Sequence, residues 1–318
     1  MTVAPSKDLQ AGQHDAPVRC SEWARANRLS PVGTIGTYRG YVLLELPLPW
    51  PRDVGQTEDG AALAPVLAGH GYRLQAVVPD GPPSAPRRMT LYVTPPGQSG
   101  FAGYRRLEAT VDESVTETLA RLIRAGQDPH PGEFDAPGTD VLVCTHGTRD
   151  SCCGRFGANL AVALRARQWR SDVRIRRTSH TGGHRFAPTF LVLPEGTSWG
   201  FADADLVETV LNRSGDAAAV SGYYRGCTGL GSSAEQALEA AVFARVGWSL
   251  LDRRRTGSVD GSHVRLSWNE AGAPVVWTGE VEAGRRVPMP ECHQPVSTAT
   301  KHETELAVRS VRRLEPHG

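Results

Sequence analysis

Residues 141–157 read VLVCTHGTRDSCCGRFG. The apolar run at 141–143 ends in Cys144 and predicts a buried strand that leads into a loop. Cys153 closes this loop in a Cys-x8-Cys arrangement, just before a helix predicted at 157–167. A thiolate at the start of a helix is stabilised by free backbone N–H groups and by the positive end of the helix dipole. The segment therefore predicts a strand, a loop and a helix, with a metal ligand or a reactive thiol in the loop.

A second segment that carries chemistry follows the next predicted strand, at 173–177. Residues 177–200 read RTSHTGGHRFAPTFLVLPEGTSWG and contain His180 and His184 in a His-x3-His pair. The two glycines between these histidines indicate a tight loop with backbone angles that a side chain would forbid. We expect this pair to leave the sheet at the end where the cysteine loop lies. Two thiolates and two imidazoles are enough to hold a metal centre.

The composition limits the classes of function. The chain has 318 residues, enough for two medium domains, and its formal net charge of +1 gives no field that would attract nucleic acid or an anionic membrane. Residues 1–17 lack the apolar run of a signal peptide, and no later run reaches the ~20 apolar residues of a membrane-spanning helix. We therefore expect a cytoplasmic protein with no nucleic-acid or membrane partner. Six cysteines, two of them adjacent, favour metal or redox chemistry over a disulfide framework in that compartment.

The pattern of the whole chain predicts an α/β fold with two domains and a C-terminal β-hairpin. We expect disorder at 1–18, a smaller α/β domain at 19–136, a second domain at 137–252, and a hairpin with a frayed, charged tail at 253–318. Strands are expected at 41–46, 72–78, 89–93, 141–144, 173–177 and 190–193, and helices at 61–68, 112–126, 157–167, 203–211 and 234–251. Both domains can be written strand, helix, strand, strand, helix, which favours an internal duplication.

The cysteine and histidine segments together resemble the sucrase/ferredoxin-like family, whose core is similar to the thioredoxin-like 2Fe-2S ferredoxins. The resemblance covers roughly residues 18–250 and is strongest at 140–202. In the parent ferredoxins four cysteines hold the cluster, and in this branch of the family His-x3-His replaces the second cysteine pair. The resemblance therefore implies a thioredoxin-like ferredoxin domain at 137–252, with the first domain possibly of the same fold. The four cluster ligands that it implies are Cys144, Cys153, His180 and His184.

This ligand set implies an electron-transfer protein that needs a redox partner protein as donor or acceptor. Neutral imidazoles in place of anionic thiolates raise the potential of a 2Fe-2S cluster, and an imidazole proton can couple to the electron. Because no Gly-x-Gly-x-x-Gly fingerprint is present, we expect a carrier or an accessory module and not a stand-alone enzyme. Two alternatives remain open: a structural Cys2His2 zinc site, and a metal-free thiol enzyme that uses Cys152 or Cys153. Cys152 is also a competitor for the second cysteine ligand.

Other polar and sulfur residues are interpreted less specifically. The residues His146 and Asp150 of the cysteine loop are expected to be exposed, with hydrogen bonding to the metal ligands as the alternative. Cys20, Cys227 and Cys292 are expected to be plain or buried thiols. A basic run contains Asp172 as its only acidic residue and is expected to be a solvated face, or else a docking surface for an acidic electron donor. The run comprises Arg165, Arg167, Arg170, Arg174, Arg176 and Arg177.

Overall fold

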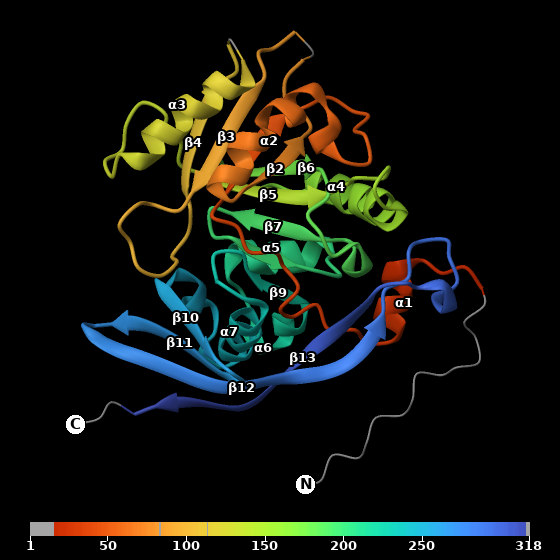
Figure 1. The fold of residues 1–318 in the computed structure, drawn as a ribbon, viewed down its shortest axis with the longest axis vertical. Coiled ribbons are helices and arrows are strands. Elements are labelled where there is room, and N and C mark those ends of the chain that lie inside the picture. The colour runs from red at the N-terminus through yellow and green to blue at the C-terminus, as the bar shows by residue number, and fades with distance from the viewer. Residues whose placement is uncertain (1–15, 83, 113, 316–318) are drawn as a thin grey trace.

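The computed structural model describes residues 16–82, 84–112 and 114–315, which form two β-sheets with associated helices (Figure 1). The larger sheet has nine strands of mixed direction, and the smaller, C-terminal sheet has four antiparallel strands. The predicted α/β class is therefore confirmed. Most of the predicted disordered segment, residues 1–15, lies outside the described residues. Within the described part of the chain, no helix is long and apolar enough to cross a membrane.

Residues 40–127 build the first half of the large sheet. Its elements are β1 (Gly40–Glu45), α2 (Glu58–His70), β2 (Tyr72–Val77), β3 (Arg88–Val93), β4 (Arg105–Thr110) and α3 (Val115–Gln127). The strands lie in the order β4-β3-β1-β2, with β1 and β2 parallel and the other neighbours antiparallel. Both helices start at side-chain caps, because the hydroxyl oxygens of Thr57 and Ser114 accept backbone N–H groups of the first helical turn. The sequence pattern did not indicate β4.

Residues 139–212 repeat this arrangement in the second half of the sheet. The elements are β5 (Thr139–Cys144), α4 (Ala158–Arg165), β6 (Val173–Thr178), β7 (Phe190–Leu193), β8 (Thr197–Trp199) and α5 (Ala204–Asn212). Their strand order is β6-β5-β7-β8, again with the first two strands parallel and the others antiparallel. A further strand, β9 (Tyr224–Cys227), pairs with β8. The two halves therefore share both strand order and strand direction, as an internal duplication would produce.

The two halves meet where β2 and β6 run antiparallel. Arg176 of β6 is 2% exposed at this junction, and its guanidinium lies 2.7 Å from the carboxylate of Glu45 on β1. Arg174, also on β6, lies 2.9 Å from the carboxylate of Glu108 on β4. The predicted solvated basic face is wrong for these two arginines. The other half of the sheet covers Arg176, and Arg174 is paired with carboxylates from both halves, Glu108 and, at 2.8 Å, Asp140 of β5.

The C-terminal sheet is larger than the predicted hairpin. It consists of β10 (Arg255–Asp260), β11 (His263–Glu270), β12 (Ala273–Pro288) and β13 (His302–Leu314). The hairpin itself is confirmed as β11 and β12, which turn at Ala271 and Gly272 with positive φ angles of 49° and 83°. The predicted frayed tail is wrong, because residues 302–314 pair along β12 and charges such as Arg309 and Glu282 lie 2.9 Å apart across the strands.

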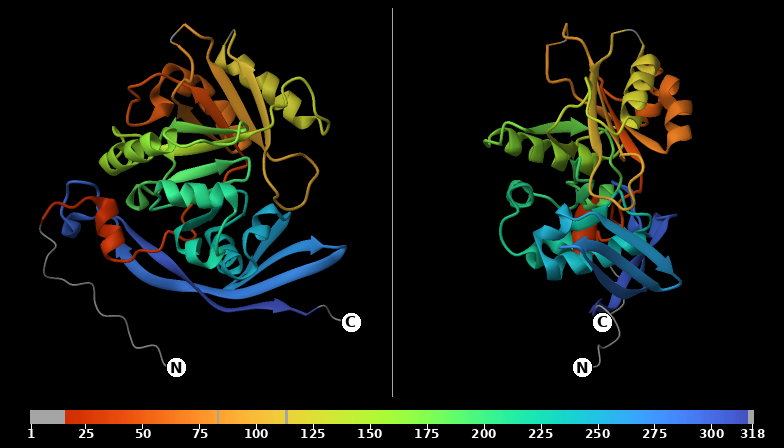
Figure 2. Two further views of the ribbon diagram at one scale, coloured as in Figure 1. Left: turned by 180° about the vertical axis from the view of Figure 1, so that it is seen from behind. Right: turned by 90° about the vertical axis from the view of Figure 1, so that its left-hand side faces the viewer.

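The ribbon formed by β12 and β13 brings the C-terminal part of the chain to the N-terminal helix α1 (Cys20–Ala26), as both views show (Figure 1, Figure 2). The N–H of Val18 donates to the carbonyl of Gln294 at 3.1 Å, and the N–H of His293 donates to the carbonyl of Val18 at 2.8 Å. Helix α7 (Ser233–Val246) packs against β9 and against all four strands of the small sheet. The segments around residues 18–20 and 292–294 are therefore held together, although they are far apart in sequence.

Candidate metal centre

The cysteine loop and the histidine loop leave the same edge of the large sheet. β5 and β6 are parallel, and Cys144 at the end of β5 pairs in register with Thr178 at the end of β6. Because parallel strands end at one edge, the two loops that follow start side by side. This placement confirms the expectation that the cysteine and histidine segments meet.

Glycines allow the cysteine loop to fold closely onto its own strand. A Cβ atom on Gly157 would lie 1.8 Å from the carbonyl oxygen of Cys144, and one on Gly154 would lie 2.5 Å from the Cα atom of Gly147. Neither position has room for a side chain. The helical turn that begins at Cys153 is therefore held directly against the end of β5.

Three of the four predicted ligands converge. The Sγ atoms of Cys144 and Cys153 each lie 3.9 Å from Nδ1 of His180. All three ligand atoms lie within 4.8 Å of one another. Both cysteines are fully buried, whereas His180 is half-buried. The two buried thiols and the half-buried imidazole therefore form a compact group of candidate metal ligands, with His180 as its most exposed member.

The two buried thiols shift each other's pKa in opposite directions. Cys153 donates a hydrogen bond to Cys144, and together with the nearby His180 this bond holds the pKa of Cys144 well below its usual range. The same bond and burial raise the pKa of Cys153 well above its usual range. A second thiolate in this space requires a cation to balance its charge, and a bound metal ion supplies that balance.

His184 lies beside this group but faces away from it. Its ring centroid is 5.9 Å from that of His180, while its Nδ1 atom lies 3.0 Å from the carboxylate of Asp150 and 3.2 Å from Sγ of Cys20. The loop between the histidines has the predicted positive φ angles, +85° at Gly182 and +70° at Gly183. A rotation of the His184 ring is needed before it can join the three converging ligands.

His146 lies beside the candidate ligands and contacts the backbone of one of them. It was expected to be exposed, but it is buried, and its Nδ1 atom accepts the backbone N–H of His180 at 3.1 Å. Its Nε2 atom lies 2.8 Å from the carbonyl oxygen of Pro51, so this nitrogen carries the proton and donates it. Burial lowers the pKa of His146, which favours the neutral ring with this tautomer. His146 therefore fixes the backbone from which His180 projects.

Asp150 is also buried and organises the cysteine pair. One of its carboxylate oxygens accepts the backbone N–H groups of Cys152 at 2.9 Å and Cys153 at 3.2 Å. This is the role of a helix N-cap, and it sets the direction in which each of the two neighbouring thiols points. Cys153 points to Cys144, whereas Cys152 lies against Cys292, with 3.1 Å between their Sγ atoms.

The part of the chain that contains this arrangement matches a known protein family. Residues 31–226 match the family described as Sucrase/ferredoxin-like. The chain belongs to this family. The sucrase/ferredoxin-like region spans the four predicted ligands, but it excludes Cys20, Cys292 and the C-terminal sheet. No curated protein and no solved structure matches the chain.

In this sucrase/ferredoxin-like chain, a hollow of about 330 Å³ reaches His180 from the surface. Arg52, Arg73, Arg149 and His146 are among the residues that line it. The guanidinium of Arg73 donates to the carbonyl of His180 at 2.7 Å. The outward side of the candidate metal centre is therefore positively charged.

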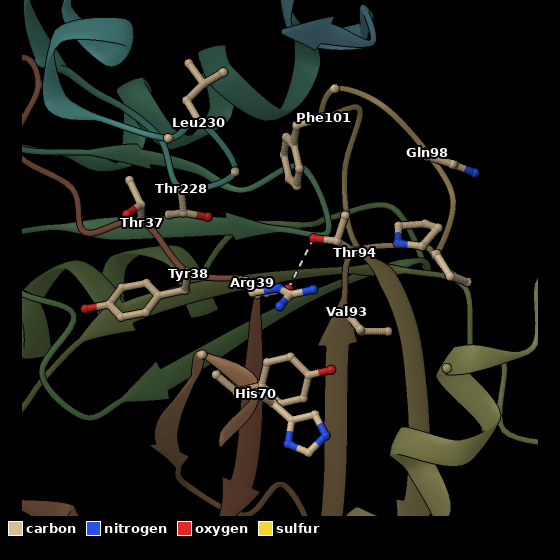
Figure 3. A pocket seen from close by; sticks show the side chains of 18 of the residues that line it. Thr37, Tyr38, Arg39, His70, Val93, Thr94, Gln98, Phe101, Thr228 and Leu230 are labelled. Atoms are coloured by element: carbon tan, nitrogen blue, oxygen red, sulfur yellow. Dashed lines mark hydrogen bonds between the residues drawn. The ribbon is translucent and has the colours of Figure 1, made fainter. Parts of the chain in front are cut away.

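A larger cavity, of about 790 Å³, lies elsewhere (Figure 3). Tyr38, His70, Phe101 and Leu230 are among its lining residues, and the hydroxyl of Thr94 donates to the backbone carbonyl of Arg39 at its wall. No cysteine of the described chain lines this cavity. It is therefore separate from the candidate metal centre.

Proposed function

We propose that this protein is an electron carrier that holds a 2Fe-2S cluster through Cys144, Cys153, His180 and His184. The observation that carries the proposal is the convergence of two fully buried thiols and one half-buried imidazole at the ends of two neighbouring parallel strands. Membership of the sucrase/ferredoxin-like family supports the same ligand set. Each half of the large sheet has the order of a thioredoxin-like fold, second strand, first, third and fourth, and we propose that fold for both halves.

The donor set fits such a cluster in its chemistry. Thiolates and imidazoles are the ligands that hold 2Fe-2S clusters, and the fourth donor, His184, is adjacent to the other three. When bound, the cluster supplies a centre that accepts and returns one electron. The chain's own residues position the ligands: His146 holds the backbone of His180, and Asp150 caps the turn that carries Cys153. Two neutral imidazoles in place of two thiolates lower the negative charge of the ligand set, and this favours a relatively high potential.

The burial of both adjacent cysteines disfavours the metal-free thiol enzyme. Cys152 and Cys153 are each 0% exposed, whereas a nucleophilic thiolate must be reached by its substrate. The structural zinc alternative uses the same donor set, so metal analysis is the measurement that distinguishes it from a 2Fe-2S cluster.

Anaerobically purified protein should be brown and should contain about two iron and two sulfide ions per chain. Reduction with dithionite should give the rhombic EPR signal of a spin-one-half centre. Iron and sulfide without that signal would contradict the proposed ligation. Zinc that is lost from the Cys144→Ser variant, in a protein without iron, would instead support the structural zinc site.

We further propose that the redox partner docks with an acidic surface over the hollow at His180. The support is charge: Arg52 and Arg149 are exposed at its rim, and Arg73 is in its wall. His180 is half-buried and lines this hollow, whereas Cys144 and Cys153 are fully buried, so we propose that electrons leave through the His180 ring.

Replacing Arg149 with glutamate should slow oxidation of the reduced protein by hexacyanoferrate(III), an anion, about threefold to tenfold at low salt. Oxidation by the cation hexaammineruthenium(III) should become faster in the same variant, because the local field changes sign. The matched control is Arg265→Glu, at an exposed position on β11 in the C-terminal sheet. Equal changes for both oxidants, or equal effects of both variants, would count against the docking site.

A further inference from the structure

A second group of metal-ligating side chains lies beside the candidate cluster site. It joins Cys20 at the start of α1, Cys152 in the cysteine loop and Cys292 in the segment between β12 and β13. The Sγ atom of Cys292 lies 3.1 Å from that of Cys152 and 3.3 Å from that of Cys20. With the carboxylate of Asp150, these ligand atoms all lie within 4.8 Å of one another. Cys20 is buried, which is one form of the expectation for it, but Cys20 and Cys292 are not plain thiols, because both contact other cysteines.

The surrounding backbone holds this group in place. Backbone hydrogen bonds between Val18 and residues 293–294 bring Cys20 and Cys292 together. The N–H of Cys20 also points at Sγ of Cys292, at 3.4 Å, and such a donor stabilises a thiolate. Cys20 and Cys152 are fully buried, and Cys292 is partly buried. Three segments from distant parts of the chain thus meet at sulfur atoms that are shielded from water.

The sulfur atom of Cys292 lies within hydrogen-bond distance of the other two sulfur atoms. The thiol of Cys292 donates to Sγ of Cys20 at 3.3 Å, and the Sγ atoms of Cys152 and Cys292 lie 3.1 Å apart. Three thiol groups with one carboxylate are a donor set of high affinity for a divalent, thiophilic ion. When such an ion binds, it displaces the thiol protons and neutralises the thiolates.

The group adjoins the candidate cluster site at His184, whose Nδ1 lies 3.2 Å from Sγ of Cys20, but it shares no cysteine with that site. Cys152 and Cys153 are neighbours in sequence, yet their side chains belong to different groups. Cys20 and Cys292 both lie outside the region that matches the sucrase/ferredoxin-like family. The second group is therefore built by segments that this chain adds before and after that region.

We propose that Cys20, Cys152, Cys292 and Asp150 bind a structural zinc ion. The ion ties α1 and the C-terminal segment to the loop that carries Cys153. Asp150 has a place in both arrangements: one oxygen caps the cysteine turn, and the other faces Cys20 and His184. A zinc ion at the second site therefore also holds the Asp150 carboxylate that caps the turn carrying Cys153.

Metal analysis of the intact chain tests this proposal. Purified protein should contain about one zinc ion per chain, in addition to any iron. The double variant Cys20→Ser, Cys292→Ser should lose the zinc and keep the visible spectrum and the iron content. Cys227→Ser is the matched control, because Cys227 is a buried free cysteine outside both groups, and it should keep both metals.

Two measurements on the unmodified chain keep the test decisive if the double variant does not fold. Metal-free protein with added cobalt(II) should show the thiolate-to-cobalt charge-transfer bands and the strong d–d bands of tetrahedral coordination. Zinc removal should speed amide hydrogen exchange at Val18 and His293 by about tenfold or more, because their paired segments are released.

Three results would overturn the proposal. They are purified protein without zinc and without cobalt–thiolate bands, a disulfide between any two of the three cysteines in anaerobic protein, and loss of iron together with zinc in the double variant. The last result would assign these cysteines to the cluster. A protein that lacks iron but keeps zinc at this site would contradict the proposed electron-transfer function and leave the zinc site standing.

Discussion

Replacing Cys144 with serine is expected to remove the visible chromophore and nearly all of the bound iron. The Cys144 side chain is fully buried at the end of β5, and its sulfur is one of the three converging ligand atoms. A serine hydroxyl at this position is a harder and much less acidic donor, so it does not replace a thiolate on iron. The measurements are iron and sulfide content and the visible absorption of anaerobically purified protein.

The control for this variant is Cys227→Ser, which also replaces a fully buried, unpaired cysteine. Cys227 lies on β9 and its thiol faces the carbonyl of Glu195, at 3.8 Å, so its loss should leave iron content and spectrum unchanged. His180→Cys is a second comparison, because a thiolate there keeps the ligand count but adds negative charge. Its cluster should persist with a potential lower by on the order of 0.1 V. Full iron content in Cys144→Ser would mean that the cluster is held elsewhere.

Local sequence patterns were sufficient to predict the core of the candidate site. The apolar run at 141–144 and the alternation at 173–177 each predicted a strand, and the two strands are parallel neighbours. Spacing then predicted that the loops after them meet, because such loops share one edge of a sheet. The glycines of the histidine loop were also interpreted correctly from their chemistry, since both have positive φ angles.

Long-range pairing was not predictable in the same way. Arg174 and Arg176 alternate with Val173 and Ile175, a pattern that predicts one buried and one solvated face. Both faces are in fact covered around Arg176, because the other half of the sheet contributes Glu45. Likewise, the charged residues of 302–314 resembled a tail, and only their pairing with β12 makes them a strand.

The second cysteine group shows the same limit most clearly. Cys20 and Cys292 are separated by almost the whole chain, and no local period connects them. One signal was available: Cys152 was only an alternative to Cys153, and Cys20, Cys227 and Cys292 had no specific role. Four such cysteines in a chain without a disulfide framework are a reason to expect a second metal site, although the fold is needed to show which of them meet.

Replacing Glu239 with glutamine is expected to lower the free energy of unfolding. Glu239 of α7 and Arg255 of β10 are both 0% exposed at their side chains, and their charged groups lie 2.5 Å apart. The carboxylate also accepts the hydroxyl of Tyr224 at 2.9 Å and the backbone N–H of Cys227 at 3.0 Å. One side chain thus connects α7 with β9 of the large sheet and β10 of the small sheet.

The Glu239→Gln variant leaves the guanidinium of Arg255 buried without a counter-charge, and such a charge is costly in a space that excludes water. The free energy of unfolding should fall by about 3–5 kcal/mol, as for other buried pairs that lose one partner. Denaturant unfolding followed by circular dichroism measures it. The matched control is Glu208→Gln, which breaks the exposed pair with Arg167 and should cost about 0–1 kcal/mol.

Measuring the free energy of unfolding together with iron content and potential would show whether Glu239 affects only the fold. Glu239 does not contact the candidate ligands, so folded Glu239→Gln protein should keep the iron content and potential of the parent chain. If its stability falls by less than about 1 kcal/mol, the buried pair does not hold the two sheets together as the contacts indicate. If the potential shifts instead, then α7 and β9 influence the cysteine loop through the sheet, and the separation between scaffold and site that the fold implies would be incorrect.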